Sequence, residues 1–558
     1  MPRWMSWEEA FARARAEAKP LLLVLTAPWC HWCRVLEAEG LADPGIAALV
    51  ERAFVPVEVN ADLRPDIHDR YNLGGLPTVA VLAPDGALLA GSTFLPAADL
   101  RRLLEEAERR WRSEPGAIAE ETARQARLRA RWAGTPPRPG LEPAVVDRTL
   151  AFLRASFDPE EGGFGLSPKF PHPDALRFLL AIHSFTGDDA LARIARRSLD
   201  ALATGGLWDA AEGGFFRYSP ARDWSRPHTE KLAAENARLA VTFLEAVQAL
   251  GEPRYREHGR ATLRFLLERL SLDEAAFAAS VAADEAYYRL PLDARREEEP
   301  PAVDPTVYAD ANARVAAALL LGAAVLGEPA WEDRAVRVLG RLERLAPPAG
   351  APLAHALLDG RPALPGLLRD QVAALAALVE AYQATGEEAW LDWGRHLADW
   401  LGETLRDPEA GGFLDRPPEA APGYLGDRLT PLGANAEAAL ALRDLAWLTG
   451  EERYREWGEA ALRALAPRAE TARLWGASYA LAVALWDQEP VEITVFGAPT
   501  AAETRALRRA ADALYLPGKL VCPVGEGAPA LVLCAGGVCF PPLEDPRALA
   551  EVVAQLPR

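Results

Sequence analysis

A repeated helix-ending signal constrains this 558-residue chain more than any other feature. Between residues 141 and 487, five of the glycines that precede an Asp or Glu recur at intervals of 59 to 76 residues, each after an apolar stretch rich in Ala and Leu. The five glycines are Gly187, Gly251, Gly327, Gly386 and Gly450. Glycine readily adopts the left-handed backbone conformation that commonly follows a helix. Each copy therefore predicts the end of one helix and the start of another, which makes this region a series of helical hairpins.

Five hairpins, with a sixth whose first helix is predicted over about 474–486, are enough to close an (α/α)6 barrel. An open solenoid of stacked hairpins is the alternative. Gly-Gly-Phe turns at 162–164, 213–215 and 411–413 favour a barrel with one functional mouth.

A polar residue stands fifteen positions before each of the five glycines, at the predicted start of an inner helix. This ladder consists of His172, Asn236, Asn312, Gln371 and Asn435. One interpretation is helix capping, which Asn performs well. The other is that the five side chains ring a shared cavity and bind its ligand. Both interpretations stay open from the sequence.

The stretch from 205 to 240 joins the first hairpin to the second and concentrates polar and aromatic groups. It carries Arg217, Tyr218, Trp224, His228, Glu230, Lys231, Glu235 and Asn236. An acid, a base, a cation and aromatic rings together suit a sugar or polyol pocket, whereas a rigid, salt-bridged loop is the plain alternative. We expect this loop to meet the ladder at one rim of the barrel.

The chemistry predicted for this pocket is proton transfer on a sugar, as in an isomerase or 2-epimerase. His228 and His172 are the candidate acid and base, because an imidazole can serve as either near neutral pH, and Glu230 would orient one of them. The predicted substrate-binding residues are Arg217, Tyr218, Trp224, Lys231, Asn236, Asn312, Asp370, Gln371 and Asn435. A glycosidase would need two carboxylates across the cavity, for which Glu230 with either Glu235 or Asp370 is the candidate pair. A barrel that binds a glycan or client without catalysis is the remaining alternative.

Residues 1–112 predict a small α/β domain. The apolar run 21–25 reads as a buried strand, Cys30-His31-Trp32-Cys33 opens a helix, and Leu76-Pro77-Thr78 precedes a further strand. This arrangement resembles thioredoxin, in which a proline with a cis peptide bond lies beside the two cysteines. Cys30 would attack a disulfide, Cys33 would resolve the mixed disulfide and Pro77 would present the substrate. Half of a zinc site is the alternative, but the sequence has no second Cys pair near this one.

Two further regions flank the barrel. Residues 113–140 are charged and end in a Pro-rich run, so we expect a linker there. Residues 488–558 alternate like strands and predict a small α/β appendage. Its Cys534 and Cys539 either pair across a turn or stay as buried thiols, and we expect the thiols.

The formal net charge of −19 argues against nucleic acid or an acidic membrane as the partner. The first residues lack the apolar core of a signal peptide, and the longest apolar run, about 315–326, is too short to span a bilayer. We therefore expect a cytoplasmic protein. No metal or other cofactor is predicted, and the oligomeric state stays open.

Motifs along nearly the whole chain resemble one family. They are Cys30-His31-Trp32-Cys33, Val59-Asn60-Ala61-Asp62, Gly162-Gly163-Phe164-Gly165, Pro168-Lys169-Phe170-Pro171, Phe216-Arg217-Tyr218-Ser219, His228 with Glu230-Lys231, and Tyr515-Leu516-Pro517-Gly518-Lys519. They are similar to the spermatogenesis-associated, DsbH-like thioredoxin-domain family. The resemblance implies a thioredoxin-like domain joined to a six-hairpin barrel like that of N-acylglucosamine 2-epimerases. A disulfide-bearing protein client or a small sugar are the partners that it suggests.

Overall fold

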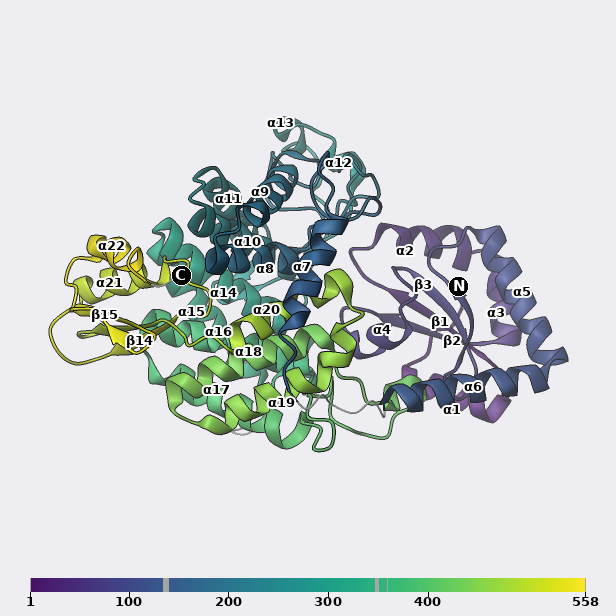
Figure 1. The fold of residues 1–558 in the computed structure, drawn as a ribbon. Helices are drawn as coiled ribbons and strands as arrows, with labels where there is room; N and C mark the ends of the chain where they lie inside the picture. The colour runs from purple at the N-terminus through teal and green to yellow at the C-terminus, as the bar shows by residue number, and fades with distance from the viewer. Residues whose placement is uncertain (1, 134–139, 347–350, 359, 557–558) are drawn as a thin grey trace. The chain divides into compact units, whose positions relative to one another are not determined.

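The computed structural model describes residues 2–133, 140–346, 351–358 and 360–556, and the chain divides into two compact units (Figure 1). Unit 1 comprises Met1–Pro136 with two later segments, Ala282–Asp284 and Asp415–Leu429. Unit 2 comprises Pro137–Val281, Glu285–Leu414 and Thr430–Arg558. The sequence does not predict the two later segments of unit 1, because nothing in their composition marks them as parts of an α/β domain.

Unit 1 is built on a four-stranded sheet with strand order β2-β1-β3-β4. The strands are β1 Leu21–Thr26, β2 Val55–Asn60, β3 Thr78–Leu82 and β4 Leu88–Ser92. β2 runs parallel to β1, whereas β3 is antiparallel to both β1 and β4. Leu21 and Leu23 enter the core on one face, and Leu22 and Val24 enter the core on the other. The continuous apolar run thus forms a strand that is covered on both faces.

Helices cover this sheet. They are α1 Trp7–Glu17, α2 His31–Val35, α3 Pro44–Ala53, α4 Pro65–Tyr71 and α5 Ala97–Ser113, with the π-helix η1 Leu36–Leu41 directly after α2. Trp7 and Phe11 of α1 pack on one face, and Leu100 and Leu104 of α5 pack on the other. The predicted thioredoxin-like fold is confirmed, and the Leu76–Pro77 peptide bond is cis.

The segment Asp415–Leu429 completes the core of unit 1. It contains the 3-10 helix η4 Gly423–Gly426, whose Leu425 is buried in the same cluster as Trp7 and Phe11. The ring of Tyr424 stacks on Tyr71 with 4.9 Å between centroids. Unit 1 is therefore not formed by the N-terminal sequence alone.

The expected linker is largely a helix, α6 Pro115–Ala133. Ala, Arg and Glu dominate it, and these residues have high helix propensity. Pro115 stands at the first position, where its missing N–H is not needed. The Pro-rich end of the expected linker, 134–139, lies outside the described residues.

Six inner helices of unit 2 form a closed ring, because each packs on the next and the last packs on the first. In ring order they are α8 Pro173–Thr186, α10 Ala233–Leu250, α14 Ala309–Leu326, α16 Leu368–Thr385, α18 Leu432–Thr449 and α20 Ala477–Trp486. The outer helices that pack on them in the same order are α9 Asp189–Thr204, α11 Arg254–Arg269, α15 Pro329–Leu342, α17 Glu388–Trp400, α19 Glu452–Ala469 and α7 Ala144–Ser156. This is the predicted (α/α)6 barrel.

The five repeat glycines end the first five inner helices as predicted. Gly187, Gly251, Gly327, Gly386 and Gly450 all have φ between 65° and 76°. In each case the glycine N–H donates a hydrogen bond to a carbonyl of the last helical turn. This carbonyl would otherwise have no partner within the helix.

Short strands and short helical segments lie in the connections of the barrel. They are β5 Lys231–Leu232, β6 Ser271–Asp273, β7 Ala276–Phe277, β8 Ser280–Val281, β9 Val303–Asp304, β10 Val307–Tyr308, β11 Ala354–Leu358, β12 Arg361–Pro365, α12 Glu285–Tyr288, α13 Leu292–Arg295, η2 Glu343–Leu345, η3 Leu401–Leu405 and η5 Arg473–Gly476. β5, β10 and β12 come shortly before inner helices, so they help to set where those helices begin.

The C-terminal residues form a second four-stranded sheet, part of which is drawn in yellow in Figure 1. Its elements are β13 Glu492–Phe496, α21 Ala502–Asp512, β14 Leu520–Val524, β15 Ala530–Ala535, β16 Val538–Cys539, η6 Pro546–Ala548 and α22 Leu549–Val553. Cys534 and Cys539 form a disulfide between paired positions of β15 and β16, so the expectation of free thiols is wrong. A two-residue turn brings the two positions opposite each other.

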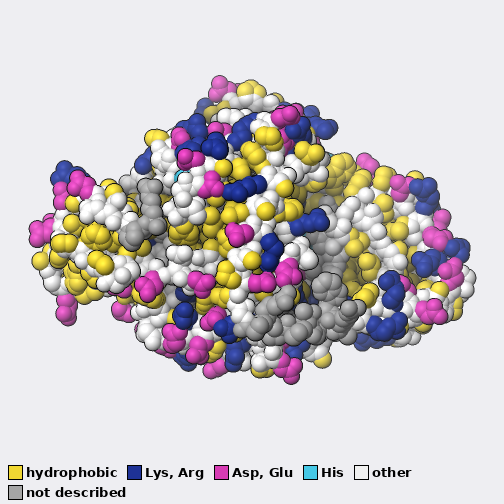
Figure 2. Space-filling model, in the orientation of Figure 1, with side chains coloured by type: hydrophobic (Ala, Val, Ile, Leu, Met, Phe, Trp, Pro, Cys, Tyr) yellow, Lys and Arg dark blue, Asp and Glu magenta, His cyan; other side chains and the backbone are white. Residues whose placement is uncertain are grey.

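The helix α14 is long and apolar enough to cross a membrane, but 78% of its 18 residues are buried inside the protein. Its place in the inner ring accounts for that composition. On the face shown in Figure 2, acidic and basic side chains are interspersed rather than gathered by sign.

Candidate functional sites

The two cysteines of unit 1 lie at the start of α2. Cys30 is the N-cap residue of this helix, and its Sγ accepts a hydrogen bond from the N–H of Cys33 at 3.2 Å. The two sulfur atoms are bonded as a disulfide. When the pair is reduced, an N–H directed at Sγ favours the thiolate of Cys30, which is the nucleophilic form.

Strand register brings the other predicted redox residue to the same edge of the sheet. Thr78 pairs with Leu25 at the end of β1, so Pro77 lies beside the loop that leads from β1 to Cys30. The parallel neighbour β2 ends at this edge too, and Asp62 follows it. Asp62 accepts a hydrogen bond from the indole of Trp29 at 2.6 Å, which anchors the residue directly before Cys30.

In unit 2, the residues predicted in the 205–240 loop converge. The ring of Tyr218 stacks on the rings of His228 and Phe170, with 4.4 and 4.7 Å between centroids. The backbone N–H of His228 donates a hydrogen bond to the carbonyl of Tyr218. Arg217 Nη1 lies 3.7 Å from Glu230 Oε1. His172 joins the group through Phe170, at 6.2 Å between ring centroids. This aromatic stack with its acid and base is the candidate barrel site.

Burial sets the proton affinities at this site. Desolvation raises the pKa of Glu230 to about 7, because the nearby Arg217 offsets it only in part. Glu230 is 2% exposed, and its Oε2 has no hydrogen-bond partner among the described residues. Burial lowers the pKa of His172 to about 4, so this imidazole is neutral at neutral pH. Glu230 is therefore better suited than His172 to exchange a proton there.

Two residues predicted to bind substrate are structural. Lys231 is fully buried, and its Nζ donates to Asp209 and to the carbonyl of Gly213, both at 2.7 Å. Trp224 is 2% exposed, and its indole donates to the carbonyl of Glu161. Both side chains thus hold the Gly-Gly-Phe turns in place, a structural role that the sequence does not predict.

The four amides of the ladder are backbone clamps. Asn236 Oδ1 accepts from the N–H of Phe215 at 2.6 Å, and its Nδ2 donates to the carbonyls of Phe215 and Leu232, both at 3.0 Å. Asn312, Gln371 and Asn435 make the same three bonds in their own repeats. All four are at most 1% exposed.

The structure therefore contradicts a substrate-binding role for Asn236, Asn312, Gln371 and Asn435, since the backbone takes both amide N–H groups and the oxygen. It also contradicts capping, because these residues lie within the first helical turn; the N-cap of α10, for example, is Leu232. The fifth position, His172, does precede its helix but makes no side-chain cap.

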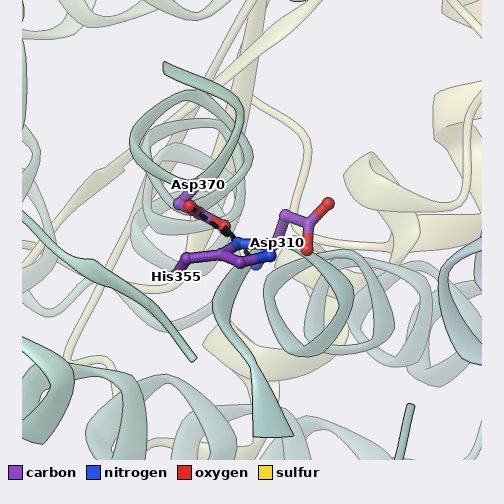
Figure 3. A group of neighbouring side chains, drawn as sticks. All are labelled: Asp310, His355 and Asp370. Atoms are coloured by element: carbon purple, nitrogen blue, oxygen red, sulfur yellow. Dashed lines mark hydrogen bonds and ion pairs between the residues drawn. The ribbon is translucent and has the colours of Figure 1, made fainter. Parts of the chain in front are cut away.

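A buried cluster of Asp310, His355 and Asp370 lies between the starts of α14 and α16 and the strand β11 (Figure 3). His355 Nδ1 lies 2.9 and 3.0 Å from the two oxygens of Asp370. The backbone N–H of Asp310 donates to Asp370, and Arg369 Nε donates to Asp310 at 3.0 Å. Asp370, predicted to bind substrate, is fully buried in this network.

This cluster offers one imidazole nitrogen and two carboxylates within 4.8 Å of one another, which are donor types that suit a divalent metal. Its charges are nevertheless already compensated. Burial opposes the charged imidazole, but Asp370 outweighs it and raises the pKa of His355. Burial alone would raise the pKa of Asp310, yet Arg369 and His355 lower it to about 2. Burial raises the pKa of Asp370, and His355 offsets this only in part, so His355 and Asp370 hold a proton between them more tightly than usual. This proton and the guanidinium of Arg369 place positive charge beside the carboxylates without a metal.

Sequence reasoning missed Asp310, His355, Arg369 and the buried lysine Lys169. A signal exists for Lys169, whose Nζ donates to Asp158 as Lys231 does to Asp209. Each of these aspartates stands four residues before a Gly-Gly-Phe turn. No comparable pattern marks His355, which reaches Asp370 from a strand.

Residues 2–129 match the family model Thioredox_DsbH, described as "Protein of unknown function, DUF255". The chain is 24% identical to Spermatogenesis-associated protein 20 of Homo sapiens over 704 residues, which cover 99% of this chain and 89% of that protein. It is 39% identical to Thiol:disulfide interchange protein DsbD 1 of Pseudomonas aeruginosa over 83 residues, 14% of each chain.

Among solved structures, cellobiose 2-epimerase from Spirochaeta thermophila superposes with a TM-score of 0.48 at 19% identity, over 61% of this chain and 84% of that one. The resemblance predicted from the sequence motifs is confirmed by the family match and the full-length relative. Residues 2–129 thus form a thioredoxin-like domain of the DUF255 family, within a chain that is similar to spermatogenesis-associated protein 20 over nearly its whole length.

Proposed function

We propose that unit 1 catalyses thiol–disulfide exchange at Cys30 and Cys33. The observation that carries this proposal is the disulfide at the start of α2, with the N–H of Cys33 directed at the sulfur of Cys30. The identity to a thiol:disulfide interchange protein over 83 residues supports it.

The exchange runs in two steps. The thiolate of Cys30 attacks one sulfur of a client disulfide, forms a mixed disulfide and releases the other client sulfur as a thiolate. The thiolate of Cys33 then attacks Cys30 Sγ, so that the second client thiol leaves and the Cys30–Cys33 disulfide forms. Two electrons pass to the client, and an external dithiol restores the reduced pair. The partner is then a protein that carries a disulfide.

Insulin reduction with dithiothreitol as the external dithiol tests this proposal. We expect the wild type to accelerate precipitation of the insulin B chain, and we expect Cys30→Ser to lose that acceleration. Cys522→Ser is the matched control, because this half-buried thiol belongs to the C-terminal sheet and its removal leaves the pair intact. Equal rates for wild type and Cys30→Ser would rule out the proposal.

We propose a second function for the barrel site: binding of a sugar, with Glu230 as the group that exchanges a proton. The supporting observation is a buried carboxyl, one oxygen of which bonds to none of the described residues, beside a stack of Phe170, Tyr218 and His228. Aromatic faces bind the apolar faces of sugars, and a carboxyl that titrates near neutral pH can act as acid or base.

A screen of aldoses for ketose or epimer formation tests the barrel proposal, with Glu230→Gln as the variant. Turnover that Glu230→Gln abolishes supports catalysis. Thermal stabilisation by a sugar without turnover supports a binding module instead. If no sugar is turned over and no sugar stabilises the protein, the sugar proposal is contradicted.

A further inference from the structure

Three residues from far along the chain lie against the Cys30–Cys33 site. The segment Ala282–Asp284 belongs to unit 1, whereas the residues on either side of it belong to unit 2. The N–H of Ala283 donates to the carbonyl of Trp29 at 3.1 Å, and Arg34 Nη2 donates to the carbonyl of Ala283 at 2.6 Å. Both backbone polar groups of Ala283 are thus bound by the residues that directly precede Cys30 and follow Cys33.

The packing around this contact is close. Ala282 and Ala283 are 6% and 5% exposed, and Cys30 and Cys33 are 4% and 6% exposed. Small side chains allow the backbone of the segment to approach the loop before α2. Extended peptides often dock on proteins through such main-chain hydrogen bonds, which place little demand on side-chain identity.

We infer that Ala282–Asp284 occupies the position of an extended client beside Cys30 and keeps the redox site closed until the segment withdraws. This inference rests on the proposed exchange function of the same site. A client disulfide must approach Cys30 Sγ directly, and a cysteine that is 4% exposed offers no room for that approach. The segment therefore regulates access to the dithiol.

The two hydrogen bonds of Ala283 are weak enough for the segment to move away from Cys30 without unfolding of the domain. A hydrogen bond of this kind shifts an equilibrium by a net factor of roughly 2–12, so the two bonds of Ala283 favour the closed state only moderately. A client that offers its own N–H and C=O to Trp29 and Arg34 would replace both bonds at little loss.

The test measures how fast iodoacetamide alkylates reduced Cys30, read by peptide mass spectrometry in full-length protein that carries Cys33→Ser. Ala283→Pro removes the N–H that binds Trp29, and Arg34→Ala removes the other bond without altering the backbone. Removing a cation beside a thiolate would by itself slow alkylation, so acceleration in Arg34→Ala reports opening. Ala302→Pro, in an exposed loop of unit 2, is the control.

We expect Ala283→Pro and Arg34→Ala each to alkylate roughly 2–12-fold faster than the parent protein, with Ala302→Pro unchanged. Unchanged rates in Arg34→Ala and in folded Ala283→Pro would overturn the inference. If Ala283→Pro fails to fold, Arg34→Ala decides the result alone. Alkylation does not depend on exchange chemistry, so the two proposals can fail separately. Faster alkylation of the variants without insulin reduction by the wild type would refute the proposed exchange function but support closure of the site by Ala282–Asp284. Insulin reduction with unchanged alkylation would support the exchange function and refute the closure.

Discussion

The clamp formed by Asn236 gives a stability prediction that can be worked out from its contacts. In Asn236→Ala, the N–H and C=O of Phe215 lose their side-chain partners at a position where Asn236 is 1% exposed. A buried polar group left without a hydrogen bond costs about 1–3 kcal/mol. Two such groups predict that the free energy of unfolding falls by about 2–6 kcal/mol.

Urea unfolding followed by far-ultraviolet circular dichroism measures this loss. Gln555→Ala is the control, because Gln555 is exposed and its amide donates to the carbonyl of Glu551, four residues earlier. We expect that control to stay within about 0.5 kcal/mol of the wild type. An Asn236→Ala protein as stable as the control would refute the clamp and restore the ligand-binding interpretation, which predicts lost ligand affinity at unchanged stability.

Three further predictions concern buried charges. Lys231→Met leaves Asp209 without one of its two buried cations, so we expect the free energy of unfolding in urea to fall by about 3–5 kcal/mol. A Lys231→Met protein as stable as the wild type would contradict the structural role of Lys231. Arg70→Ala leaves the buried Asp415 without the guanidinium that bonds it at 3.0 Å, and we expect a loss of similar size, about 3–5 kcal/mol, in unit 1; retention of wild-type stability by calorimetry would argue against it. Because the pKa of Glu230 is raised from 4.5 to about 7, the folded state binds the proton more tightly than the unfolded state, and stability falls as pH rises through this window, by about 3 kcal/mol. Glu230→Gln removes that loss, so unfolding curves that show the same difference between variant and wild type at pH 4.5 and pH 7 would contradict the raised pKa.

The barrel could be predicted because its signals are local. A glycine after a helix reports a backbone conformation of that one residue, so Gly187 and its counterparts carry the repeat in the sequence itself. The strand and helix around Cys30 are likewise marked by an apolar run and a short motif. These features need no knowledge of distant contacts.

The roles of the ladder residues could not be predicted for the opposite reason. An Asn near a helix start looks the same whether it caps the helix, faces a cavity or clamps another segment. Only the position of the Phe215 backbone distinguishes these cases, and that position depends on how the preceding turn folds back. The same holds for His355, whose partner Asp370 comes from a different element.

Unit 1 shows the limit most clearly. Leu425 and Ala283 have no sequence feature that ties them to a thioredoxin-like fold. Leu425 nevertheless completes its core, and Ala283 contacts Trp29, directly before Cys30. Contacts of this kind join residues far apart along the chain, where pattern and propensity carry no information about pairing. In contrast, Arg217, Tyr218, His228 and Glu230 were found because they are concentrated within one loop.

Mass spectrometry of the Cys33→Ser protein after exposure to oxidised glutathione tests the exchange chemistry most directly. Cys33→Ser removes the resolving thiol, so a mixed disulfide formed at Cys30 cannot proceed further. Burial and the nearby Glu492 raise the pKa of Cys522 to about 12, which keeps that thiol unreactive. We predict one glutathione per chain, attached to Cys30, and none after Cys30→Ser is added. The absence of an adduct on Cys30, or its attachment to Cys522 instead, would contradict thiol–disulfide exchange at this site.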